Sequence, residues 1–74
     1  MEKYKNTSGS SGVDSYRIET ESITVRFKDG AMYKWTNQSA GSANIDHMKK
    51  LALQGSGLNS FINTSVRKKY ASKH

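Results

Sequence analysis

The chain has 74 residues, of which 34% are hydrophobic, with no cysteine, no proline and a formal net charge of +6. A chain of this length forms one domain at most, and a core of this size rarely supplies more than about 3–5 kcal/mol of net stability. The lack of cysteine excludes disulfides, and two histidines are too few for a usual zinc site. No apolar run approaches the roughly 18 residues of a membrane span, and the N-terminal residues lack the apolar core of a signal peptide. We therefore expect a cytoplasmic protein without a metal, a cofactor or a membrane partner.

The positive charge is concentrated in the second part of the sequence. Residues 1–45 contain six basic and five acidic residues, whereas residues 46–74 contain six basic residues and one acidic residue, Asp46. Such an uneven distribution is typical of a surface that meets an anionic partner such as nucleic acid. A net charge of this size also keeps a small domain soluble, so the charge alone leaves both interpretations open.

The first twelve residues are polar, and their only large apolar side chains are Met1 and Tyr4. A segment of this composition buries too little surface to offset the entropy of ordering it. We predict a flexible tail over residues 1–12, an ordered domain over residues 13–70 and a frayed C-terminus over residues 71–74.

Three segments then alternate apolar and polar residues, which is the pattern of half-buried strands. They are VDSYRIE at 13–19, SITVRFK at 22–28 and AMYKWT at 31–36. Charged or glycine-containing turns separate the segments, so we expect a three-stranded antiparallel meander.

The apolar faces determine how the second hairpin pairs. The apolar residues of segments 22–28 and 31–36 lie on the same face of the sheet only if Phe27 pairs with Ala31. This pairing leaves the three-residue loop Lys28–Gly30. We predict a type I turn followed by a bulge in which Gly30 adopts a positive φ. The first hairpin pairs Ile18 with Ile23 by the same reasoning, and its loop is then four residues long, from residue 19 to residue 22.

The alternation ends with the third strand, and residues 36–44, TNQSAGSAN, are interpreted as a polar linker. Residues 45–55 then place apolar side chains at helical spacing, which predicts an amphipathic helix. Ser42 or Asn44 is the expected N-cap, and Gly55 is placed to adopt the left-handed conformation after the last turn.

A second helix is predicted to begin near Asn59 or Ser60. Its apolar stripe recurs every four residues and consists of Leu58, Ile62, Val66 and Tyr70, with Phe61 beside it. Basic residues end this helix, where positive charge opposes the helix dipole. The expected fold class is therefore α+β, a three-stranded antiparallel meander followed by two helices packed on one face (βββαα), with the other face open to water.

Catalysis finds little support in the sequence. Asp46 and His47 are adjacent, but neighbours in a helix point about 100° apart and do not form an acid-base pair. No serine lies in a strand-turn-helix elbow, and cysteine is absent. Residues 55–57, Gly-Ser-Gly, precede a helix as in some phosphate-binding loops, but a helix C-cap followed by a joint also accounts for them, and we favour that interpretation.

The aromatic residues of the third strand, Tyr33 and Trp35, allow two interpretations. With Tyr16 across the sheet they suit a base-stacking platform, and they equally suit a hydrophobic core. A domain with so few hydrophobic residues can hardly expose its only tryptophan, so we favour the core. The opposite face of the sheet is then a basic surface and a second candidate contact site, formed by Arg17, Arg26, Lys28 and Lys34.

The segment from Val13 to Tyr70 resembles the KTSC domain, a short module. The resemblance rests on four motifs in order: ITVRFKDG, AMYKW, LALQGSG and LNSFINTSVRKKY. The family signature is Tyr-x-Tyr, and here Trp35 replaces its second tyrosine, while TNQSAG replaces the Val-Pro that usually follows.

The resemblance implies a modest set of expectations. Such domains occur alone in bacterial and phage-type proteins and at the C-terminus of some lysyl-tRNA synthetases, and an RNA-binding role has been suggested on that association. Residues that match the family motifs are Tyr33, Trp35, Phe61, Asn63, Arg67 and Tyr70.

We therefore expect a non-enzymatic binding module that contacts RNA through its phosphates. The candidate contact residues are Lys49, Lys50, Arg67, Lys68 and Lys69. The alternative is a module for protein-protein interaction or homo-oligomeric assembly, in which a partner or a second copy covers apolar residues that a thin core leaves exposed.

Overall fold

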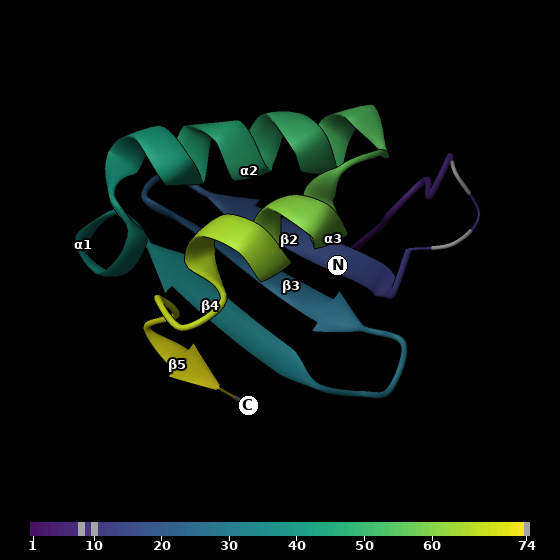
Figure 1. Cartoon of the computed structure of the whole chain (residues 1–74), viewed down its shortest axis with the longest axis horizontal. Coiled ribbons are helices and arrows are strands. Elements are labelled where there is room, and N and C mark those ends of the chain that lie inside the picture. Colours follow the sequence, from purple (N-terminus) through teal and green to yellow (C-terminus); the bar gives the residue numbers. More distant parts are fainter. Residues whose placement is uncertain (8, 10, 74) are drawn as a thin grey trace.

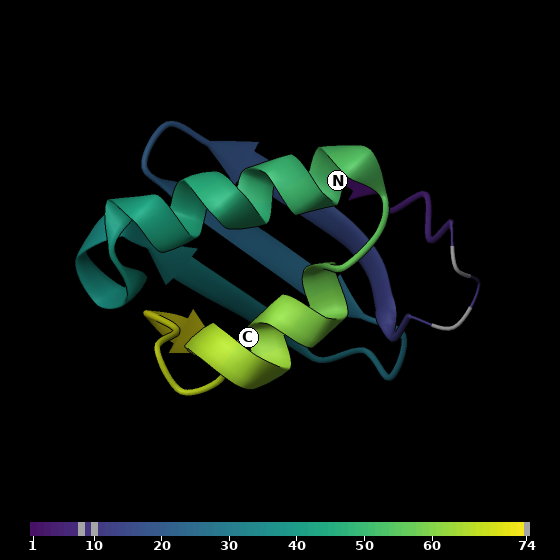
Figure 2. The ribbon, with the colours of Figure 1, turned by 45° about the horizontal axis from the view of Figure 1, so that its top comes forward.

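A five-stranded antiparallel sheet forms one layer of the computed structural model, which describes residues 1–7, 9 and 11–73. The strands are β1 (Glu2–Lys3), β2 (Val13–Glu19), β3 (Ser22–Phe27), β4 (Met32–Thr36) and β5 (Ser72–Lys73), adjacent in that order. The helical segments are α1 (Asn37–Ala40), α2 (Ser42–Gln54), α3 (Leu58–Phe61) and the π-helix η1 (Ile62–Val66). Both α2 and the α3–η1 segment cover the same face of the sheet (Figure 1 and Figure 2). The α+β class is thus confirmed, although the sheet has more strands than the three predicted.

The predicted register of the second hairpin is confirmed. Val25 lies opposite Tyr33 in the β3–β4 ladder. The backbone N–H of Phe27 donates to the carbonyl of Ala31 at 2.8 Å, which leaves a three-residue turn. Gly30 adopts a φ of 94°, the positive value that this turn requires.

The first hairpin keeps the predicted register but has a shorter loop. Ile18 pairs with Ile23 as expected, and Glu19 also pairs with Ser22. The loop therefore contains two residues instead of four, because backbone pairing continues beyond the last apolar pair. A bulge between Val13 and Ser15 shifts the register at the start of β2.

The prediction of a flexible N-terminal tail was wrong for most of its residues; Ser8 and Ser10 lie outside the described residues. Residues 2–3 form an edge strand against β2, and Tyr4 is only 3% exposed. The backbone N–H of Thr7 donates to the carbonyl of Gly55 at 2.8 Å. One buried aromatic side chain and a set of backbone hydrogen bonds therefore order a segment whose average composition is polar.

The C-terminus also differs from the prediction of a frayed end. Ser72–Lys73 pair with β4 as the opposite edge strand, and Ala71 donates its N–H to the carbonyl of Lys34. His74 lies outside the described residues. Edge strands of two residues have too little length for an alternating pattern, which is why the sequence pattern did not reveal either one.

The predicted polar linker contains a short helix. Thr36 caps α1 through a capping box with Ser39, in which each side chain accepts a hydrogen bond from the other residue's backbone N–H. The N-cap of α2 is Gly41, and neither Ser42 nor Asn44 takes that position, because α1 ends immediately before it. Gly55 ends α2 in the left-handed conformation, as predicted.

The second helix differs from its prediction at both ends. It begins at Leu58, continues as a π-helix and ends at Val66, so Arg67 and Lys68 form the turn that follows it. Lys69 donates its N–H back to the carbonyl of Val66 at 2.9 Å, which closes this turn. The chain then leaves the helix axis, and Tyr70 is 39% exposed instead of continuing the buried stripe.

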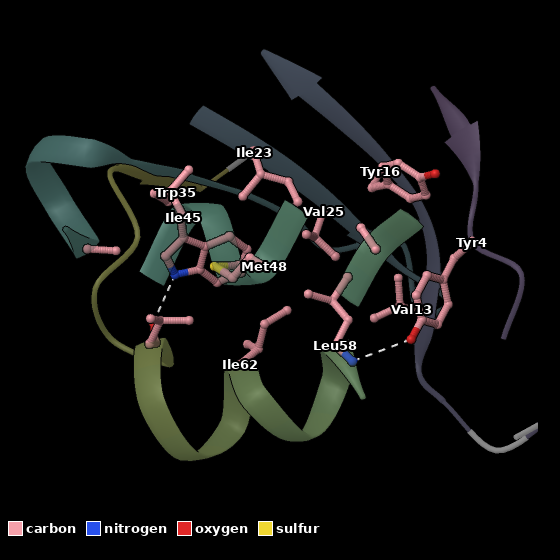
Figure 3. Packing of buried hydrophobic residues seen from close by; sticks show 13 residues of the cluster. Tyr4, Val13, Tyr16, Ile23, Val25, Trp35, Ile45, Met48, Leu58 and Ile62 are labelled. Atoms are coloured by element: carbon pink, nitrogen blue, oxygen red, sulfur yellow. Dashed lines mark hydrogen bonds between the residues drawn. The ribbon is translucent and has the colours of Figure 1, made fainter. Parts of the chain in front are cut away.

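The hydrophobic core lies between the sheet and the helices (Figure 3). Its largest fully buried side chains are Trp35, Ile23, Ile45, Met48, Leu58, Val13, Val25 and Val66. Two hydrogen bonds cross this core: the indole Nε1–H of Trp35 donates to the Val66 carbonyl at 2.8 Å, and Tyr4 Oη accepts from the Leu58 N–H at 3.4 Å (Figure 3). In the described part of the chain, no helix is long and apolar enough to cross a membrane.

Candidate nucleic-acid interface

A cleft of about 580 Å³ lies between the β3–β4 hairpin and the segment that follows η1. Its volume is within the range of about 300–1,000 Å³ that small-ligand sites occupy. Phe27, Tyr33 and Tyr70 are aromatic residues of its lining, and Arg67 and Lys68 are basic ones. The cleft thus joins aromatic and cationic side chains that are far apart in the sequence.

Tyr33 is the centre of the aromatic cluster in the cleft. Its ring centroid lies 5.9 Å from that of Phe27 and 5.0 Å from that of Tyr70, and both pairs are edge-to-face. The Nζ of Lys73 lies 5.5 Å from the centroid of the Tyr33 ring, which is a cation–π geometry. Tyr33 is therefore half-buried and held from several sides, while Tyr70 keeps an accessible ring.

Trp35 shares a face with Tyr33 but belongs to the core. It is 1% exposed, and its indole N–H is already paired with a backbone carbonyl. The indole ring therefore closes the inner wall of the cleft and presents almost no surface for stacking. Phe61, the other aromatic residue of the family motifs, packs against the core and against His47 at a centroid distance of 4.6 Å, outside the cleft lining.

The basic side chains of the cleft come from two segments. Lys28 belongs to the β3–β4 turn, and Arg67 and Lys68 belong to the turn after η1; all three are exposed. Among the described residues that line the cleft, the one carboxylate is that of Asp29, whose Oδ1 accepts a hydrogen bond from the Ala31 N–H at 2.9 Å. Positive charge therefore predominates in the lining.

The five basic residues predicted as one RNA contact do not gather on one surface. Lys49 donates from Nζ to the carbonyl of Thr20 at 2.9 Å, in the β2–β3 turn, and Lys50 is exposed on the same helix, α2. Arg67 and Lys68 face the β3–β4 turn, at the other end of β3. Lys69 is exposed beside them but does not line the cleft.

Three of the four basic residues predicted for the outer sheet face lie there, and the fourth, Lys28, does not. Arg17, Arg26 and Lys34 lie on the sheet face opposite the helices, since the register places them between the buried positions of each strand. Lys34 pairs there with Glu19 at a distance of 3.7 Å between Nζ and Oε1. Lys28 belongs to the cleft instead, because the turn removes it from the alternation of the strand.

Two cleft residues, Phe27 and Asn63, were not selected as contact residues on the basis of sequence. Phe27 fitted the alternation of a core strand, and Asn63 had no distinguishing pattern beyond its place in a family motif. Only the packing of η1 beside the β3–β4 hairpin brings them to the same cleft.

The described residues provide no metal-binding cluster, and the comparisons with known proteins found no match. In the ranges that the structure describes, no group of three or more His, Cys, Asp or Glu side chains could hold a metal ion. The chain matches no protein-family model, no curated protein and no solved structure.

Proposed function

We propose that this protein is a non-enzymatic module that binds RNA in the cleft between the β3–β4 hairpin and the segment after η1. The observation that carries this proposal is the lining itself, where Arg67 and Lys68 stand beside the aromatic rings of Tyr33 and Tyr70. Single-strand binding proteins combine cations that follow the phosphates with aromatic rings on which bases stack. The resemblance to the KTSC domain favours RNA as the nucleic acid.

The charge of the chain supports the same partner. The net charge of +6 attracts a polyanion over the whole surface, and the exposed cations of the cleft then position it. Phosphate contacts depend on salt, because each one releases counterions from the strand.

The assembly alternative has less support. Among the described residues, the exposed large hydrophobic side chains are those of Met1, Leu53 and Tyr70. Met1 lies with Arg17 and Lys34 on the outer face of the sheet, Leu53 is on helix α2 across the sheet from it, and Tyr70 lines the cleft, so these residues do not form the contiguous apolar patch that an interface between copies needs.

A salt titration of labelled single-stranded RNA tests the proposal. We expect the logarithm of the binding constant to fall by about 0.7 for each phosphate contact per tenfold rise in salt. The double variant Arg67→Gln/Lys68→Gln should weaken binding and lower this slope by about 1.4, the value for two contacts.

A matched control separates the cleft from general charge. The double variant Lys49→Gln/Lys50→Gln removes the same formal charge from helix α2, and we expect it to leave the slope nearly unchanged. An equal loss of RNA affinity in the two double variants would contradict binding at the cleft. If no RNA binds at low salt and the mass by light scattering rises with concentration, the assembly alternative replaces the proposal.

A further inference from the structure

We infer that the cleft holds one unpaired base of the strand against the ring of Tyr70, so that the protein selects single-stranded RNA over duplex. This inference rests on the proposed function and adds to it which part of the RNA enters the cleft. Phosphate contacts alone would bind single strands and duplexes with little distinction.

Tyr70 is the aromatic residue of the cleft that can accept a base. Tyr70 is 39% exposed, whereas Trp35 is 1% exposed and Tyr33 is half-buried, with Phe27, Tyr70 and Lys73 against its ring. Tyr33 contacts Tyr70 with an angle of 62° between the ring planes, and this contact supports the exposed ring from one side. Tyr33 is therefore a positioning residue, and Tyr70 is the residue that contacts the base.

The neighbouring side chains suit the rest of a nucleotide. Arg67 and Lys68 precede Tyr70 by three and two residues and line the same cleft, so a base on Tyr70 brings its flanking phosphates close to two cations. Asn63 lines the cleft as well, and its amide carries both donors and an acceptor for the edge of a base. A paired base is stacked on both faces within its helix and exposes neither face to a ring at the wall of a cleft.

An abasic strand tests this inference directly, because it keeps the phosphates and removes the bases. We compare an oligouridylate with a ribose-phosphate strand of equal length that lacks bases, both labelled and both at low salt. The wild-type protein should bind the strand with bases about 5- to 140-fold more tightly, the ratio that stacking of one base provides. A duplex of the same length should bind no better than the abasic strand.

Two variants assign the effect to the ring. Tyr70→Ala should bind both single strands with the affinity of the abasic strand, and Tyr70→Phe should keep most of the wild-type ratio, because the ring remains. Far-UV circular dichroism of both variants establishes that they are folded. If Tyr70→Ala does not fold, the wild-type ratio still decides whether the cleft holds a base, and Tyr70→Leu, which keeps an apolar side chain without a ring, replaces Tyr70→Ala in the assignment to Tyr70.

The possible failures are distinct. Equal binding of the two strands by the wild-type protein would overturn the seating of a base and leave phosphate binding intact. If Tyr70→Ala still preferred the strand with bases over the abasic strand by the wild-type ratio, the assignment of base contact to Tyr70 would be overturned. If neither strand binds, the proposed function fails together with this inference.

Discussion

Trp35 and Tyr33 lie two residues apart on β4 and point to the same face of the sheet, yet they have different environments. Trp35 is 1% exposed and donates a hydrogen bond to Val66 at the end of η1. Tyr33 lines the cleft beside Ile62 and Asn63 of η1, and it is covered only in part, by aromatic neighbours and Lys73. Position along one strand therefore separates a core residue from a residue of the cleft.

The difference follows from where the helical cover of the sheet ends. The π-helix stops at Val66, and the chain then returns through an open segment to the edge of the sheet, where β5 pairs with β4. A helix buries the sheet beneath it, whereas an open segment leaves a space beside the hairpin. The closed region around Trp35 supplies stability, and the open region around Tyr33 is available for binding. Substitutions in the two regions should therefore differ in their effects.

The largest effect is expected for Trp35→Ala. Loss of a buried large aromatic residue costs about 3–5 kcal/mol, and a core of this size rarely supplies more than that. We expect most of the protein to be unfolded, as measured by far-UV circular dichroism during urea titration. Trp35→Phe should stay folded, because the Val66 carbonyl still accepts a hydrogen bond from the Lys69 N–H. A cooperative transition for Trp35→Ala at the wild-type midpoint would contradict the assignment of this region as the core.

Tyr4→Ala should cost about 3 kcal/mol, since this side chain is 3% exposed and belongs to the core cluster. Tyr4→Phe keeps the ring and loses the acceptor for the Leu58 N–H, so about 1 kcal/mol is expected. The free energy of unfolding from urea titration measures both. If both variants were as stable as the wild type, the N-terminal segment would contribute nothing to the core, as expected of the flexible tail that the composition predicts.

Two glycines compare a crowded position with an open one. Gly55→Ala forces an alanine into the left-handed conformation, at a φ of 83°, and brings its Cβ to 2.6 Å from the Cβ of Lys5. Gly30→Ala has a φ of 94° but meets no atom within 4 Å. Backbone strain of about 1–2 kcal/mol applies to both, and the contact with Lys5 adds a further loss for Gly55→Ala alone. Equal thermal midpoints for the two variants would show that the N-terminal segment does not press against Gly55.

Tyr70→Ala should have the smallest effect on stability. The side chain is 39% exposed, and the substitution removes one edge-to-face contact, worth about 0.5–1.5 kcal/mol. The urea midpoint should therefore fall much less in Tyr70→Ala than in Trp35→Ala, although Tyr70→Ala removes the ring that contacts the base. A loss as large as that of Trp35→Ala would place Tyr70 in the closed region and remove the contrast between the two regions.

Local patterns predicted the central part of the sheet correctly. The apolar residues of β3 and β4 share a face only in a register that places Val25 opposite Tyr33. This register leaves a three-residue turn, in which Gly30 adopts a positive φ. Gly55 was likewise placed correctly at the end of α2, because a helix that ends in the left-handed conformation favours glycine. These features depend on residues close in sequence.

The α+β class, the three central strands and the register of the second hairpin could be predicted from the amino-acid pattern, because periodic burial repeats along the chain. Four features could not: the burial of Tyr4, the exposure of Tyr70, the two-residue strands at both edges, and the gathering of Lys28, Arg67 and Lys68 at the cleft. Alternation gives the direction in which a side chain points, but its burial depends on whether a distant segment covers it. Covering segments meet the sheet through contacts between residues far apart in the chain, and such contacts leave no local pattern.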